Sequence, residues 1–137
     1  MKLLWIMLAG ALGTGARYGL TVAIHSWLSG RGSGSFVAGA QGTTFPLGTL
    51  VVNVVGSLLL AFIATLALHE MVKPELRLIL GTDFLGAFTT FSTFELEAEN
   101  LLSSGQWLAT TLYVGGNLLL GFGAIFLGRA IALRVLV

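Results

Sequence analysis

Long apolar stretches alternate with short polar segments along this chain of 137 residues. Two of the stretches, residues 47–68 and 107–128, contain no charged side chain. A helix needs about 20 apolar residues to cross the hydrocarbon core of a bilayer, which is about 30 Å thick. Both stretches are therefore predicted to be transmembrane helices.

Two further stretches are apolar but carry ionisable groups. Residues 3–28 contain Arg17 and His25, and residues 77–102 contain Asp83 before ending in a glutamate-rich run. In lipid, the backbone groups of a spanning segment must be hydrogen-bonded within the protein, so helices are the expected form of these stretches too. We expect an all-α membrane protein with four transmembrane helices, forming a single domain over residues 1–137.

The composition supports a membrane protein. The chain is 55% hydrophobic and 9% charged, with a mean hydropathy of +0.93, whereas soluble domains carry about 25% charged residues. This composition excludes an ordinary soluble enzyme and a disordered tail, and a net charge of +1 offers no electrostatic footprint for nucleic acid. The absence of cysteine excludes disulfides and thiolate metal sites. No phosphate-binding loop, catalytic triad or zinc motif is present, so we do not expect an enzyme.

The segments outside the apolar stretches bear on processing and orientation. Lys2 and the run up to residues 9–11 also fit a cleavable signal peptide, but the apolar stretch continues beyond Arg17, which favours a retained helix. Residues 29–46 are rich in Gly and Ser and are predicted to form a surface loop. Most basic residues fall near one side of the predicted bundle, which favours both termini in the cytoplasm. These residues are Lys2, Lys73, Arg77, Arg129 and Arg134.

Polar side chains recur every fourth residue within two of the apolar stretches. Thr49, Asn53 and Ser57 share one face of the second predicted helix, and Tyr113 and Asn117 make a similar stripe on the fourth. One interpretation is packing with interhelical hydrogen bonds. The other is a polar lining along an ion pathway, in which the Asn53 amide offers N–H donors to an anion.

The densest polar signal lies at residues 86–94, in the third predicted helix. Hydroxyl side chains beside glycine favour a break, because they can hydrogen-bond to backbone groups in place of helical partners. A break inside a membrane is tolerated only where it is buried in protein or lines a cavity. Carbonyls freed there on two chains would suit a hard cation such as Na⁺. The hydroxyl residues are Thr89, Thr90, Ser92 and Thr93.

Three phenylalanines in the same segment have two interpretations. Phe88, Phe91 and Phe94 are spaced three apart and lie near one side. They are either core residues or rings whose positive edges stabilise a partly dehydrated anion without binding it too tightly.

Arg17 and Glu97 also have two interpretations each. Arg17 lies roughly 20 Å along its helix, where a charge needs a partner, a watery vestibule or a path to the interface. It either attracts anions at a vestibule or clamps broken backbone. Glu97 belongs either to a solvated helix end or to the polar pathway.

Three motifs carry a family resemblance. They are residues 13–18 (GTGARY), residues 48–56 (GTLVVNVVG) and residues 86–94 (GAFTTFSTF). Their order, spacing and placement in a four-helix layout resemble the Fluc (CrcB-type) fluoride channels over nearly the whole chain.

The resemblance implies a dual-topology dimer of two antiparallel copies in the cell membrane, with two pores that export fluoride passively and so lower its toxicity. It implies a central Na⁺ that is not transported, held by the main-chain carbonyls of Gly86 and Thr89. Asn53, Phe91 and Phe94 match pore residues, and Arg17 matches the arginine of the first helix. The remaining matches, in the polar region and just beyond it, are Thr90, Ser92, Thr93 and Glu97.

Two alternatives remain at this point. A proton-coupled multidrug-type transporter would need an intramembrane carboxylate, for which Asp83 is the deepest candidate. A non-conducting assembly subunit would use the small-residue faces for packing alone.

The basic-residue asymmetry also favours one orientation, which leaves open a separate, oppositely oriented partner subunit.

Overall fold

The computed structural model describes residues 2–29 and 45–136, and this part of the chain contains helices and no strand. The predicted loop at residues 29–46 lies almost wholly outside the described residues. The helices occur in the order α1 (Lys2–Ser29), α3 (Leu47–Leu68), α4 (Pro74–Arg77), η1 (Leu78–Leu85), α5 (Gly86–Phe88), α6 (Phe91–Ser103) and α7 (Trp107–Val135).

Three of these helices, α1, α3 and α7, are long and apolar enough to cross a membrane. The bounds of α3 match the prediction, whereas α7 continues to Val135 instead of ending at Gly128. The extension follows from the sequence, because residues 129–135 contain neither glycine nor proline and include strong helix formers. The described chain is therefore an all-α, multi-pass membrane protein.

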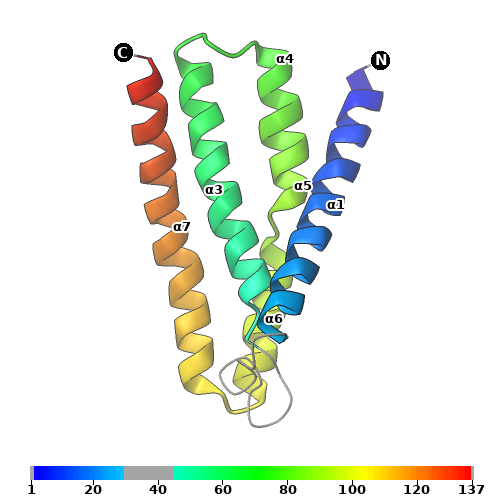
Figure 1. Ribbon diagram of the computed structural model, residues 1–137, viewed down its shortest axis with the longest axis vertical. Coiled ribbons are helices and arrows are strands. Elements are labelled where there is room, and N and C mark those ends of the chain that lie inside the picture. The colour runs from blue at the N-terminus through cyan, green and yellow to red at the C-terminus, as the bar shows by residue number, and fades with distance from the viewer. Residues whose placement is uncertain (1, 30–44, 137) are drawn as a thin grey trace.

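The helices run alongside one another with both chain ends at the same end of the bundle (Figure 1). The turn between α3 and α4 lies at that end too, and the turn between α6 and α7 lies at the other. Lys2 begins α1, Arg77 ends α4 and Arg134 lies in the last turn of α7. The predicted gathering of basic residues at one end is thus confirmed for these positions, while Arg31 lies outside the described residues.

Glycines bring the helices into close contact. A Cβ atom at Gly13 would collide with the Phe84 carbonyl, and one at Gly128 would collide with the Leu58 carbonyl. A Cβ at Gly48 would lie 2.7 Å from the Thr21 side chain. Small residues let helices approach closely where lipid supplies no hydrophobic driving force. These contacts hold α1 against α3 and against the third segment, the name used here for α4, η1, α5 and α6 together (residues 74–103), and they hold α3 against α7.

Gly56 positions the third segment against α3. A Cβ there would collide with the Thr89 side chain and lie 3.3 Å from Phe88 Cδ1. We expect Gly56→Ala to destabilise the fold by about 1–3 kcal/mol, the usual cost of overpacking, measured as a lower midpoint of thermal unfolding in detergent. Gly123→Ala on α7 is the matched control, because open space surrounds its Cβ position and alanine favours the helix. Equal unfolding midpoints for the two variants would contradict the tight packing at Gly56.

Candidate functional site

The third segment is interrupted at Thr89 and Thr90. Helix α5 ends at Phe88, Thr89 and Thr90 have extended ψ angles of 161° and 123°, and α6 restarts at Phe91. The predicted break within residues 86–94 is confirmed. Upstream of the break, η1 is a π-helix over Leu78–Leu85, which the sequence analysis did not anticipate. π-Helical segments are rare in proteins and often lie at functional sites.

Hydrogen bonds at the break leave the Gly86 and Thr89 carbonyls without their helical partners. In a continuous helix, the Thr90 N–H would bond to the Gly86 carbonyl and the Thr93 N–H to the Thr89 carbonyl. Instead, the Thr90 N–H donates to Asn53 Oδ1 at 3.0 Å, and the Thr93 N–H donates to Thr90 Oγ1 at 3.3 Å. The Gly86 and Thr89 carbonyls, which were predicted to face a cation, therefore lack the N–H donors that a continuous helix would give them.

Asn53 on α3 holds the break in place. Its Nδ2 donates to the Thr90 carbonyl at 3.2 Å and to Asn117 Oδ1 at 3.0 Å, while its Oδ1 accepts from the Thr90 N–H. Asn117 Nδ2 in turn donates to the Tyr113 carbonyl at 3.0 Å. The interhelical hydrogen bonds proposed for these stripes are therefore present. Both amide hydrogens of Asn53 are engaged, so donation to an anion would require exchanging one of these bonds.

Glu97 lies in the polar interior. Its carboxylate accepts from Thr49 Oγ1 at 3.0 Å and from the Tyr113 hydroxyl at 2.6 Å. Thr49 and Tyr113 are both buried, whereas Glu95 and Glu99 are exposed. The sequence analysis left open whether Glu97 faced solvent or the pathway, and the structure places it with polar partners on α3 and α7.

The specific grouping of Thr49, Glu97 and Tyr113 was not predicted. One signal could have found it, because Glu97 follows Thr93 by four residues and therefore lies on the same helix face. Thr93 on that face accepts a hydrogen bond from Thr90 Oγ1 at 2.9 Å. Thr90 is the N-cap of α6, the helix that restarts after the break.

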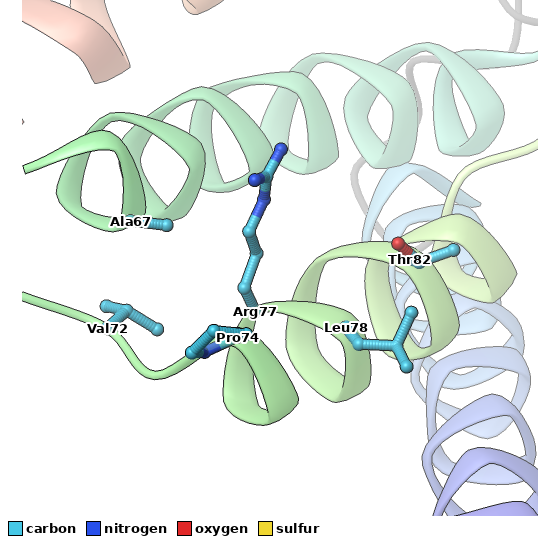
Figure 2. A pocket seen from close by; sticks show the side chains of 6 residues that line it. All are labelled: Ala67, Val72, Pro74, Arg77, Leu78 and Thr82. Atoms are coloured by element: carbon cyan, nitrogen blue, oxygen red, sulfur yellow. The ribbon is translucent and has the colours of Figure 1, made fainter. Parts of the chain in front are cut away.

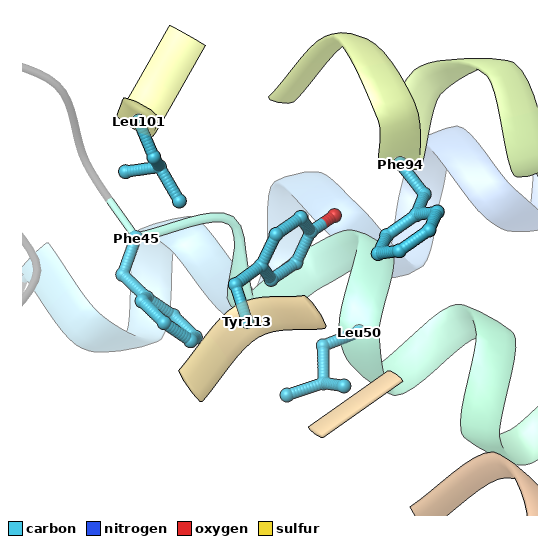
Figure 3. Packing of buried hydrophobic residues seen from close by; sticks show 5 residues of the cluster. All are labelled: Phe45, Leu50, Phe94, Leu101 and Tyr113. Atoms are coloured by element: carbon cyan, nitrogen blue, oxygen red, sulfur yellow. The ribbon is translucent and has the colours of Figure 1, made fainter. Parts of the chain in front are cut away.

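The three phenylalanines occupy different environments. Phe88 is buried and stacks on Phe84 with ring centroids 6.3 Å apart, so its role is core packing. Phe94 is 9% exposed and lies 5.5 Å from the Tyr113 ring, within the cluster seen in Figure 3. Phe91 is 69% exposed, although its centroid is only 5.8 Å from that of Phe94. Phe91 is thus the ring available to a partner or an ion.

An open cavity of about 220 Å³ lies beside the break. It brings predicted site residues from two segments together, because α3 contributes Asn53 and the third segment contributes Thr89, Thr90 and Phe91. The full lining is Asn53, Ser57, Leu60, Thr89, Thr90 and Phe91. The cavity combines hydroxyl groups, an amide and an aromatic ring without a charged side chain.

Some predicted residues lie away from this polar cluster. Gly86 and Ser92 are exposed on the protomer. Arg17 is half-buried and has no hydrogen-bond or ion-pair partner within residues 2–29 and 45–136, so these contacts do not support the backbone-clamp interpretation. In the same described ranges, Asp83 Oδ2 is buried without a hydrogen-bond partner.

Comparison with known proteins agrees with this arrangement. The family described as CrcB-like protein, Camphor Resistance (CrcB), matches residues 4–129. A relative from Nitratidesulfovibrio vulgaris is 44% identical over 128 residues, covering 93% of each chain. A relative from Acidobacterium capsulatum is 40% identical over 136 residues, covering 98% of each chain. Both relatives are named fluoride-specific ion channel FluC. With the family match spanning nearly all of its length, and with the broken third segment described above, this chain belongs to the CrcB family.

Proposed function

We propose that the protein is a fluoride-specific ion channel that lets fluoride leave the cytoplasm passively. The observation that carries the proposal is the broken third segment, whose polar groups meet those of α3 and α7 through Asn53. The relatives, named as fluoride-specific channels and aligned over nearly the whole chain, support the ion. The chain is accordingly a transport protein and not an enzyme.

The ion path proposed here runs along the cavity beside the break. Thr89, Thr90 and Asn53 line it. The two threonine hydroxyls donate to the Leu85 carbonyl and to Thr93 Oγ1, so they add polarity to the wall while their protons are already engaged. Phe91 presents an exposed ring whose edge can stabilise a partly dehydrated anion without a fixed charge. Weak, distributed contacts of this kind allow an ion both to enter and to leave. Ser92, Thr93 and the Glu97 network with Tyr113 and Asn117 extend the polar region around this path.

We further propose that two antiparallel copies assemble in the cell membrane, each crossing it four times with the broken segment as the third crossing. An isolated protomer would expose the break to lipid, which a membrane protein tolerates only when the irregular backbone is buried in protein or lines a cavity. Gly86, Phe91 and Ser92 are exposed on the protomer beside the break. A second copy over this face would enclose both breaks and both cavities.

A Na⁺ ion is proposed to lie between the two breaks. The Gly86 and Thr89 carbonyls fit it, because Thr90 and Thr93 direct their N–H groups to Asn53 and to the Thr90 hydroxyl instead. The bound ion would supply positive charge that holds opposed carbonyl dipoles together. We expect replacing Na⁺ by N-methylglucamine to lower the thermal unfolding midpoint of the purified protein, with recovery on adding Na⁺. An unchanged midpoint would count against the Na⁺ site.

Flux from liposomes tests the channel directly. Vesicles holding fluoride or chloride are prepared with the purified protein, and efflux is followed with ion-selective electrodes. We expect fast fluoride release without a proton gradient and chloride release no faster than from empty vesicles. Efflux that stops when the proton gradient is removed would indicate a coupled transporter instead, and no efflux of either anion would indicate a non-conducting subunit.

A further inference from the structure

A cavity of about 310 Å³ opens between the first turns of α1 and the start of the third segment. Both elements begin at the end of the bundle that holds the chain termini (Figure 1). This cavity shares no lining residue with the one beside the break, so it is separate from the proposed ion path. Its lining consists of Lys2, Trp5 and Ile6 from α1 and of Glu75, Leu78 and Ile79 from the third segment.

The cavity runs from the membrane interface into the hydrocarbon core. Helix α3 ends at Leu68 after 22 residues, a length that crosses the hydrocarbon, and Glu75 follows the turn beyond that end. Lys2 begins α1 at the same end of the bundle. Ile6 and Ile79 lie four residues further along their elements, which is about one helical turn deeper. Charged groups at the mouth and apolar side chains below it repeat the head-and-tail order of a phospholipid.

The mouth of this cavity carries one charge of each sign. Lys2 and Glu75 are both exposed, and neither has an ion-pair or side-chain hydrogen-bond partner within residues 2–29 and 45–136. Arg77 faces elsewhere, because its side chain extends toward α3 and lines a different cavity (Figure 2). A ligand that engages both free charges therefore needs an anionic group for Lys2 and a cationic group for Glu75.

The chemistry of the mouth favours a headgroup with a primary ammonium. Phosphatidylethanolamine has a phosphate that can accept from Lys2 and an ammonium whose N–H groups can donate to Glu75, both as charge-assisted hydrogen bonds. A choline headgroup has the same charges but no N–H donor, and a glycerol headgroup has no cation for Glu75. Trp5, which is 58% exposed at the wall of the cavity, is of a residue type enriched at this membrane depth.

We propose that this cavity binds phosphatidylethanolamine, with the headgroup between Lys2 and Glu75 and the first part of an acyl chain against the apolar lining. The bound lipid fills the space between α1 and the third segment at this end of the bundle. The inference rests on the membrane location of the protein and not on the ion that it conducts.

Trp5 provides the readout, because brominated acyl chains quench tryptophan fluorescence on contact. The chain has three tryptophans, so Trp27→Phe together with Trp107→Phe leaves Trp5 alone. This double variant is reconstituted into phosphatidylcholine vesicles that contain increasing fractions of dibromostearoyl phosphatidylethanolamine or, in matched vesicles, of dibromostearoyl phosphatidylcholine. We expect the apparent affinity for the ethanolamine lipid to be at least about threefold higher, a modest preference because exposed ion pairs are weak.

Charge variants in the same background test the two headgroup contacts. Glu75→Gln should abolish the preference, because Glu75 distinguishes the two headgroups. Lys2→Gln should lower the affinity for brominated phosphatidylethanolamine by at least about twofold, since it removes the partner of the phosphate. Glu70→Gln and Lys73→Gln are the matched controls and should retain the preference, because both residues are exposed at the same end of the bundle and lie outside the cavity lining. Monodisperse elution of each variant in detergent establishes that it is folded.

A second background tests whether the preference belongs to this end of the molecule. Trp5→Phe with Trp27→Phe leaves Trp107, which is 70% exposed at the start of α7, at the opposite end of the bundle. We expect both brominated lipids to quench Trp107 equally.

Three results would overturn the inference. Equal quenching of Trp5 by the two brominated lipids would mean ordinary lipid contact without a site. Stronger quenching by brominated phosphatidylglycerol than by the ethanolamine lipid would mean that Lys2 alone attracts an anionic headgroup. Absence of quenching by every lipid would mean that protein, such as a second copy of the chain, covers the cavity. Fluoride efflux is measured separately, so each of these results leaves the channel proposal standing.

Discussion

Replacing Asn53 by Asp should stop fluoride conduction almost completely. The substitution preserves size and keeps an acceptor for the Thr90 N–H, but it removes both donations made by Asn53 Nδ2. The Thr90 carbonyl and Asn117 Oδ1, both half-buried, then each lose a donor, at a cost of up to about 1–3 kcal/mol for each acceptor. A carboxylate facing the cavity also repels an entering anion. We expect fluoride efflux to fall by about 100-fold or more, since 1.36 kcal/mol of barrier corresponds to about tenfold in rate.

Asn100→Asp provides the matched control for this experiment. Asn100 is exposed near the end of α6, so the same chemical change there adds a charge without disturbing the break. Efflux from liposomes is compared for the two variants at equal protein density. Efflux from Asn53→Asp equal to that from Asn100→Asp would mean that Asn53 serves packing alone.

Replacing Phe91 or Phe94 by Ile should also suppress conduction, with different effects on stability. Isoleucine remains apolar but has no ring quadrupole, so an anion at the ring edge would lose its stabilisation. We expect efflux to fall at least about tenfold in each variant, which corresponds to a barrier increase of about 1.4 kcal/mol. Phe91 is 69% exposed in the protomer, so its replacement should disturb protomer packing only through the loss of its ring contact with Phe94.

The two phenylalanine variants differ because Phe94 packs against Tyr113. Losing that aromatic pair should destabilise the fold by about 0.5–1.5 kcal/mol beyond the change in buried area. Phe122→Ile on α7 is the control, since Phe122 is 61% exposed and lies far from the break in the chain. Thermal unfolding in detergent separates the stability effect from the flux effect. Unchanged flux in both Phe91→Ile and Phe94→Ile would remove these rings from the ion path.

The sequence analysis succeeded where local chemistry dominates. The uncharged run of α3 predicted both of its ends, because apolar length is the main requirement for crossing lipid. The break at Thr89 and Thr90 was also predictable, since adjacent hydroxyl side chains compete with the backbone for hydrogen bonds. The structure adds that the competing groups include Asn53, which replaces a helical acceptor for the Thr90 N–H.

Features that depend on distant contacts were not predictable. Thr49 and Glu97 are hydrogen-bonded across 48 positions of sequence, and periodicity within a single helix cannot identify such a pair. The π-helical hydrogen bonding of η1 was missed because its apolar composition is compatible with an ordinary α-helix. Dual topology, the second copy and the Na⁺ ion remain predictions.

The order of Asn53, the break and Asn117 along the chain has a consequence for biogenesis. Translation delivers α3 first, so the amide that pairs with Thr90 is already made when the interrupted backbone leaves the ribosome. Asn117 arrives last and engages the second hydrogen of that amide. Nascent chains ending before α7 would therefore hold the break with the two Asn53–Thr90 hydrogen bonds alone, and the third bond of Asn53 would form only when the final helix is inserted.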